Sequence, residues 1–84
     1  MYKIEYLENV VEDDIHSLSK SDKLKIKRAI EEKLVNDPVR FGKPLQYSLK
    51  GCRRLRVGDY RIICIIEKNI VLIVKIGHRK EVYK

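Results

Sequence analysis

The chain has 84 residues, which is enough for one small domain and too few for two. Its longest apolar runs, at 62–66 and 70–74, fall far short of the roughly 20 residues that a membrane-spanning helix needs. The first residues alternate between polar and apolar types and then turn acidic, unlike a secretion signal. We therefore interpret residues 1–84 as a single domain of a cytoplasmic protein that makes no membrane contact.

Charge is distributed unevenly along the chain. The formal net charge is +7, but residues 1–42 carry net −1 and residues 43–84 carry net +8. Such asymmetry favours a polyanionic partner, with nucleic acid first among the candidates. A solvated basic surface without a partner is the alternative.

The two cysteines do not form a metal-binding pattern. Cys52 and Cys64 are far from a C-x-x-C spacing, and His16 is distant in sequence. In a cytoplasmic protein we expect both thiols to be reduced, with Cys64 acting as a small core residue. The sequence thus predicts neither a metal nor a cofactor.

The first half of the chain predicts one strand followed by two helices. Residues 2–7 alternate as a half-buried strand does, and residues 8–18 show the apolar spacing of an amphipathic helix. Ser21 is expected to cap a second helix that runs to about Val35 and ends before Pro38. The apolar positions of this second helix repeat every four residues, at Ile26, Ile30 and Leu34.

The second half predicts a run of antiparallel strands. Residues 39–43 are expected to form a loop, residues 45–49 a short strand, and Lys50-Gly51 a turn. An Ile- and Val-rich meander then follows, with expected strands at 53–57, 60–66 and 70–76.

Two turns are expected to connect the strands of the meander. Gly58-Asp59 is a hairpin signal, and Asn69 is expected to adopt the left-handed conformation in the second turn. The predicted fold is therefore α+β: an N-terminal strand, an α-hairpin and an antiparallel β-meander, with the helices packed on one side of the sheet.

Basic residues are placed regularly on this predicted meander. Because side chains alternate along a strand, Arg54 and Arg56 should share one face and leave Leu55 and Val57 for the other. Arg61 lies across the first hairpin and is expected to join the two arginines.

Four segments together resemble a known family. GKPL at 42–45, LKG at 49–51, RLRVGDYR at 54–61 and IGHRKEVY at 76–83 are similar to the RelE/ParE superfamily of bacterial toxins. The resemblance implies the toxin of a type II toxin–antitoxin system, held inactive by a small RelB-like antitoxin in a hetero-oligomer. RelE-like members cut mRNA in the ribosomal A site without a metal, whereas ParE-like members poison DNA gyrase.

Carrying the RelE pattern onto this sequence assigns its functional residues. The catalytic basic pair falls on Arg54 and Arg56, which are lysines in the best-known member, and the other catalytic positions fall on Arg61, Arg79 and Tyr83. Further RNA contacts are expected from basic residues nearby, namely Lys50, Arg53, Lys75 and Lys80. We therefore favour a ribosome-dependent mRNA endonuclease, with a ParE-like gyrase inhibitor or a non-catalytic RNA- or antitoxin-binding module as alternatives.

RNA cleavage by its own 2′-OH sets the chemistry that these residues must supply. The reaction needs a base for the hydroxyl, cations for the dianionic transition state and an acid for the leaving oxygen. Arginine stays protonated, so it serves the second role only. Tyr83 is expected to act as the base or to stack on a nucleobase, and His78 could act as an acid or base.

Overall fold

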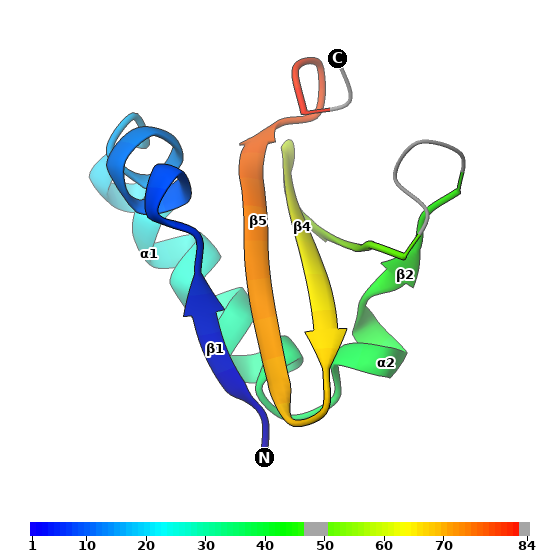
Figure 1. Cartoon of the computed structure of the whole chain (residues 1–84). Coiled ribbons are helices and arrows are strands. Elements are labelled where there is room, and N and C mark those ends of the chain that lie inside the picture. The colour runs from blue at the N-terminus through cyan, green and yellow to red at the C-terminus, as the bar shows by residue number, and fades with distance from the viewer. Residues whose placement is uncertain (47–50, 83–84) are drawn as a thin grey trace.

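The computed structural model describes residues 1–46 and 51–82. In chain order, its elements are β1 (Lys3–Tyr6), η1 (Val10–Ile15), α1 (Lys20–Ala29), η2 (Ile30–Leu34), α2 (Pro38–Phe41), β2 (Lys43–Pro44), β3 (Arg53–Val57), β4 (Tyr60–Glu67) and β5 (Ile70–His78). The strands form one five-stranded sheet in the order β1-β5-β4-β3-β2. The helices cover one side of this sheet, so the predicted α+β class is confirmed (Figure 1).

The antiparallel meander of β3, β4 and β5 is confirmed, and each of its two hairpins closes through two residues. Gly58 begins the first turn with φ of 59°, a left-handed conformation that favours glycine. The prediction for the second turn is wrong, because Lys68, with φ of 52°, takes the left-handed conformation instead of Asn69. Since β4 continues through Glu67, Lys68 is the first turn residue and occupies the position that Gly58 occupies in the first hairpin.

The N-terminal strand extends the meander in parallel. β1 pairs with the first half of β5, from Lys3 opposite Ile70 to Tyr6 opposite Ile73, and the chain then leaves the sheet. Beyond that point Asp14 covers the edge of β5: its Oδ2 accepts a hydrogen bond of 2.9 Å from the backbone N–H of Ile76. A side chain from η1 thus accepts a hydrogen bond from the edge of β5 beyond the point where β1 stops pairing with it.

Both predicted helices are present, with π-helical turns in each. The helix expected over 8–18 is shorter and consists of η1, whereas α1 and η2 together form the second helix. Ser19, and not Ser21, caps this second helix, because the Ser19 hydroxyl accepts a hydrogen bond of 3.1 Å from the N–H of Asp22. The helix begins at Lys20, so the prediction placed its cap two residues too late.

The predictions for the segment after the helices are wrong in two places. Residues expected as a loop form α2, because Asp37 Oδ1 caps the N–H of Arg40 at 3.2 Å and Pro38 takes the first helical position. Of the strand expected over 45–49, only Leu45 and Gln46 are described and neither lies in a strand, since β2 ends at Pro44; residues 47–50 lie outside the described part. Gly42 connects α2 to β2 where an added Cβ would lie 2.7 Å from the carbonyl oxygen of Pro38, so only glycine fits without a shift.

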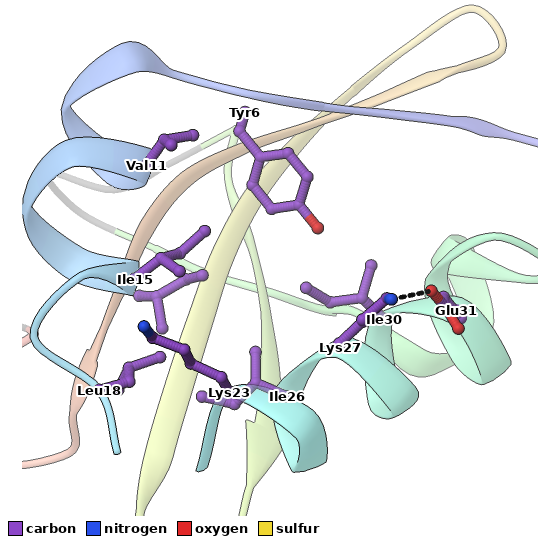
Figure 2. A pocket seen from close by; sticks show the side chains of 10 residues that line it. Tyr6, Val11, Ile15, Leu18, Lys23, Ile26, Lys27, Ile30 and Glu31 are labelled. Carbon is purple, nitrogen blue, oxygen red and sulfur yellow. Dashed lines mark ion pairs between the residues drawn. The ribbon is translucent and has the colours of Figure 1, made fainter. Parts of the chain in front are cut away.

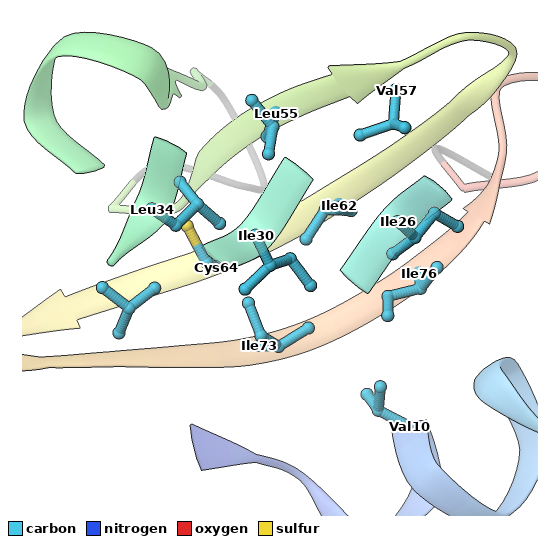
Figure 3. Close-up of a cluster of buried hydrophobic side chains, with 11 residues drawn as sticks. Val10, Ile26, Ile30, Leu34, Leu55, Val57, Ile62, Cys64, Ile73 and Ile76 are labelled. Carbon is cyan, nitrogen blue, oxygen red and sulfur yellow. The ribbon is translucent and has the colours of Figure 1, made fainter. Parts of the chain in front are cut away.

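The core lies between the helices and one face of the sheet. Ile26, Ile30 and Leu34, which repeat every four residues along the second helix, are buried, and Figure 3 shows them against the strands. The sheet contributes Leu55, Val57, Ile62, Cys64, Val71, Ile73 and Ile76, and η1 contributes Val10. Cys64 is fully buried, as predicted. None of the helices in the described part has the length and apolar character required to cross a bilayer.

Burial of Cys64 predicts a specific loss of stability in alkali. Desolvation raises the pKa of its thiol from 9.0 to about 11. Above pH 9 the unfolded chain ionises while the folded chain stays protonated, so this thiol's contribution falls until the pH passes the folded pKa. Urea unfolding under reducing conditions should show that Cys64→Ala loses less stability between pH 9 and pH 11 than the parent, by about 2–3 kcal/mol.

Cys52→Ala is the matched control, because it removes a thiol and leaves Cys64 in place. It should show the same alkaline loss as the parent. Equal losses in both variants would refute the role of Cys64.

Candidate functional site

The face of the sheet opposite the helices carries the predicted arginines. Leu55 and Val57 are buried in the core, while Arg54 is half-buried and Arg56 is exposed, so the alternation along β3 is confirmed. Arg56 lies directly opposite Arg61 in the antiparallel pair of β3 and β4. Two like charges at opposed positions destabilise a sheet, which marks this pair as a site held for a purpose other than stability.

Backbone carbonyls fix the Arg61 guanidinium. Its Nη1 donates to the carbonyl oxygen of Gly58 at 3.0 Å and to that of Tyr60 at 2.9 Å. Both acceptors belong to the first hairpin, so the charge is held at the end of the sheet where this turn lies. Within the described residues, no ion pair involves Arg61, so its acceptors there are neutral carbonyls.

Arg79 contacts the same turn through Asp59. The backbone N–H of Arg79 donates to the carbonyl oxygen of Asp59 at 2.8 Å, and the Arg79 Nε lies 3.8 Å from Asp59 Oδ1. Both side chains of this ion pair are more than half exposed, so it is weak and exchangeable. We call Arg56, Arg61 and Arg79 the arginine cluster; the chain after β5 turns back at this end of the sheet in Figure 1.

The last described residue packs beside this cluster. Val82 is buried, and a Cβ added to Gly77 would lie 3.6 Å from the Val82 Cβ. Gly77 is the cross-strand partner of Arg61, so the C-terminal turn crosses the arginine face next to Arg61. Tyr83 follows Val82 in sequence and lies outside the described residues, as does Lys50.

Two other predicted cations take structural roles. Arg53 points to the helix side, where its Nη1 donates to the carbonyl oxygens of Gly42 at 2.8 Å and Val39 at 3.3 Å, which fastens α2 to β3. Lys75 Nζ lies 3.7 Å from Asp14 Oδ1, at the edge of β5. Lys80 is exposed in the turn after β5.

His78 lies on the opposite face from the arginine cluster. Its ring meets the ring of Tyr60 edge to face, with centroids 5.9 Å apart, and its Nδ1 accepts a hydrogen bond of 3.2 Å from the N–H of Lys80. Tyr60 packs against the core from the helix side. The Asp22 carboxylate is the main cause that raises the pKa of the Tyr60 hydroxyl, which therefore stays protonated at neutral pH.

A groove along the outer edge of β3 gathers cations that the sequence did not single out. β2 pairs only with Arg53 and Arg54, so no strand among the described residues pairs with the rest of β3 on its outer edge, opposite β4. The groove there has a volume of about 550 Å³. It is lined by Lys33, Phe41, Lys43, Pro44, Arg54, Leu55 and Arg56. Lys33 and Lys43 come from η2 and β2, and no local sequence pattern places them beside β3.

An apolar hollow of about 350 Å³ lies between η1 and α1 (Figure 2). Its walls include Val11 and Ile15 from η1 and Ile26 and Ile30 from the second helix. Tyr6 reaches into it, and burial together with the nearby Glu31 raises the pKa of the Tyr6 hydroxyl. The hollow therefore offers apolar surface with one protonated hydroxyl.

Among residues 1–46 and 51–82, no group of three or more His, Cys, Asp or Glu side chains is placed to hold a metal ion. Both cysteines are free thiols.

Comparison with known proteins identifies the family. Residues 7–83 match the profile described as the ParE toxin of the type II toxin–antitoxin system parDE. The chain belongs to this toxin family, within the RelE/ParE superfamily.

Individual relatives agree with this assignment. The chain is 38% identical over 53 residues to toxin RelG and 40% identical over 53 residues to toxin RelE, both of Mycobacterium tuberculosis. The match covers 61% of this chain in each case, and 61% of RelG and 55% of RelE, so the chain spans less than two thirds of these curated relatives. The toxin–antitoxin complex RelBE2 of the same organism contains a chain with a TM-score of 0.85 and 28% identity, over 93% of this chain and 98% of that one.

The opposed arginines predict a stabilising substitution. Arg56→Thr removes the like-charge contact with Arg61 and places a β-branched residue in β3, so it should raise the free energy of unfolding by roughly 0.2–1 kcal/mol at low salt. The gain should shrink at high ionic strength, because salt screens exposed charges. Urea unfolding at two salt concentrations measures both effects.

Lys3→Thr is the control, since Lys3 is an exposed strand cation whose cross-strand partner is the apolar Ile70. It should show no salt-dependent gain. A gain in Lys3→Thr as large as that in Arg56→Thr would contradict the repulsion argument.

Proposed function

We propose that this chain is the toxin of a type II toxin–antitoxin system and that it cuts mRNA on the ribosome in the manner of RelE. The observation that carries the proposal is the convergence of Arg56, Arg61 and Arg79 on the Gly58–Asp59 turn. Three cations held around one hairpin suit a phosphodiester that gains negative charge as it reacts. Because ribosomes are its target, the protein acts in the cytoplasm.

The reaction that fits is attack of the RNA 2′-oxygen on the adjacent phosphorus, which forms a 2′,3′-cyclic phosphate and breaks the bond to the 5′-oxygen of the next nucleotide. A base takes the 2′-OH proton, and an acid protonates the departing 5′-oxygen. The guanidinium of Arg61 is fixed by two carbonyls, so it is already oriented when the substrate arrives and costs no reorganisation. Arg79 would exchange its weak pairing with Asp59 for a phosphate oxygen. Arg54 and Arg56 would hold the neighbouring backbone, since arginine binds phosphate through two parallel hydrogen bonds.

Proton transfer needs a group other than arginine. We assign it to Tyr83, which follows Val82 in sequence, where Val82 packs beside the cross-strand partner of Arg61. The phenol has an ordinary pKa near 10, and nearby cations would lower it. His78 is the weaker candidate, because its ring contacts Tyr60 on the helix side of the sheet.

The second candidate function is inhibition of DNA gyrase. The matched family profile carries the ParE name, and ParE-like members of the superfamily act on gyrase. The arginine cluster favours the nuclease, because Arg61 and Arg79 both contact the first hairpin and Arg56 lies opposite Arg61, which gathers positive charge at one end of the sheet.

An antitoxin is the expected protein partner. The RelBE2 neighbour from M. tuberculosis is a toxin–antitoxin complex, and the apolar hollow between η1 and α1 provides a place where a partner segment can bury apolar side chains. Exposed Glu12 and Asp13 lie on η1 near the hollow, while Lys23, Lys27 and Glu31 line it from the second helix, where Lys27 Nζ lies 3.9 Å from Glu31 Oε1. The segment that fits is an amphipathic helix with its apolar side chains in the hollow and basic residues toward η1.

Removing the side-chain charge of Arg61 or of Arg79 should abolish most of the mRNA cleavage. Arg61→Ala and Arg79→Ala should each lower the rate by about 30- to 1,000-fold, which corresponds to roughly 2–4 kcal/mol of transition-state stabilisation. Arg→Lys should recover part of the rate, because lysine lacks the planar fork. Tyr83→Phe should lose nearly all activity if the hydroxyl is the base and little if the ring only stacks. Primer extension on translated mRNA measures these rates.

Circular dichroism and antitoxin binding check that the variants fold. Cleavage at the parental rate by both arginine variants would exclude these residues from the chemistry. A parent protein that spares translated mRNA but breaks or relaxes gyrase-bound DNA would decide for the second candidate.

The antitoxin assignment predicts a site-specific loss of affinity. Val11 is 50% exposed in the wall of the hollow, and Leu24 is 51% exposed on α1 outside it. Val11→Gln should weaken antitoxin binding roughly 10-fold, about 1.4 kcal/mol, and leave mRNA cleavage by the free toxin unchanged. Leu24→Gln, the matched control, should bind as the parent does in calorimetry. Equal affinities for both variants would show that the hollow is not the docking site.

A further inference from the structure

The groove along the outer edge of β3 carries cations without counter-charges. Lys33, Lys43, Arg54 and Arg56 reach it from η2, β2 and β3. The ion pairs within the described residues involve Lys27, Lys75 and Arg79, so none of these four cations is neutralised there. Four like charges around one groove of about 550 Å³ repel one another, and an anion in the groove would relieve that repulsion.

Arg54 gives an independent sign of a missing ligand. Its Nε is buried and has no hydrogen-bond acceptor within the described part of the chain. A buried donor without a partner costs about 1–3 kcal/mol and calls for an explanation such as a bound ion. Since Arg54 lines the groove, an anion bound there would supply the acceptor once the guanidinium turns to expose its Nε.

Phe41 arranges further positive charge beside the groove. Lys33 Nζ lies 5.9 Å and Arg40 Cζ 5.2 Å from the centre of the Phe41 ring. Cation–π contacts hold both charges near the ring, so Phe41 serves as a platform for cations. The groove is thus a charged binding surface with one aromatic wall, as is common in sites that follow a single-stranded nucleic-acid backbone.

We infer that this groove binds a phosphate of an RNA backbone and leads the strand toward the arginine cluster. Arg56 belongs to both the groove and the cluster, so the two positive regions are continuous along β3. Lys33 and Lys43 are therefore RNA-binding residues that act on affinity and not on bond breaking. The inference rests on the proposed nuclease function for its choice of RNA over an acidic peptide.

The test removes the two groove lysines and retains their apolar stems. Lys33→Gln combined with Lys43→Gln should raise the Kd for a single-stranded RNA oligonucleotide roughly 10-fold at low salt. The slope of log Kd against log salt should fall by about 1.4, since single-stranded RNA contributes about 0.7 for each phosphate contact. The rate of mRNA cleavage at saturating programmed ribosomes should stay at the parental value. Lys3→Gln combined with Lys20→Gln is the control, because it removes the same charge outside the groove.

Separate binding measurements identify the source of the phosphate. Weaker binding to the free oligonucleotide supports the inference with mRNA as the source. Weaker binding to vacant ribosomes, with oligonucleotide binding unchanged, would overturn it, because the groove would then hold ribosomal RNA and not the strand that reaches the arginine cluster. If the groove and control variants behave alike on both RNAs, the inference fails.

Loss of antitoxin affinity alone would also overturn it and would assign the groove to an acidic peptide. A parent protein that binds the oligonucleotide through the groove but does not cleave translated mRNA would refute the proposed function and leave the groove intact.

Discussion

Burial of one sheet face by the helices is the constraint on which the rest of the structure depends. Leu55, Val57 and Ile62 belong to the core on the helix side and leave most of the opposite face, apart from the buried Ile63, open to polar side chains. Because side chains alternate along a strand, the same short segments supply core residues and exposed arginines in turn. The residues that stabilise the core and the residues that carry positive charge therefore alternate along the same strands and point to opposite faces of the sheet.

Backbone groups orient the arginines of the basic face, and repulsion between these arginines lowers the stability of the fold. Carbonyl oxygens at the first hairpin orient Arg61, and the exposed Asp59 holds Arg79 only weakly. Stronger acidic partners would stabilise the hairpin but would compete with an incoming phosphate. The apolar core on the other side offsets the repulsion that remains, as burial of a single large apolar side chain contributes about 1.5–3 kcal/mol.

Strong local periodicity explains which parts were predictable from the sequence. The apolar runs of the long strands, their turn residues and the four-residue spacing of the second helix predicted the correct fold class, and the alternation along β3 placed Arg54 and Arg56 on the right face. Short elements depend on tertiary contacts, so α2 was expected as a loop and β2 was not predicted. The sequence could not show that Arg53 donates its hydrogen bonds to the carbonyl oxygens of Gly42 and Val39. Nor could it show that Lys33 and Lys43 both lie beside β3, because these contacts join segments that are distant along the chain.

The contact between Asp14 and Ile76 has a consequence for how the protein behaves in a concentrated solution. β5 is the longest and one of the most apolar strands, and an uncovered edge of such a strand can recruit a strand from a second molecule. The Asp14 carboxylate accepts a hydrogen bond from one backbone N–H of β5 that β1 leaves unpaired. It also places a negative charge where the backbone of a second molecule would have to approach. Pairing of a second molecule with this part of the β5 edge is thereby disfavoured.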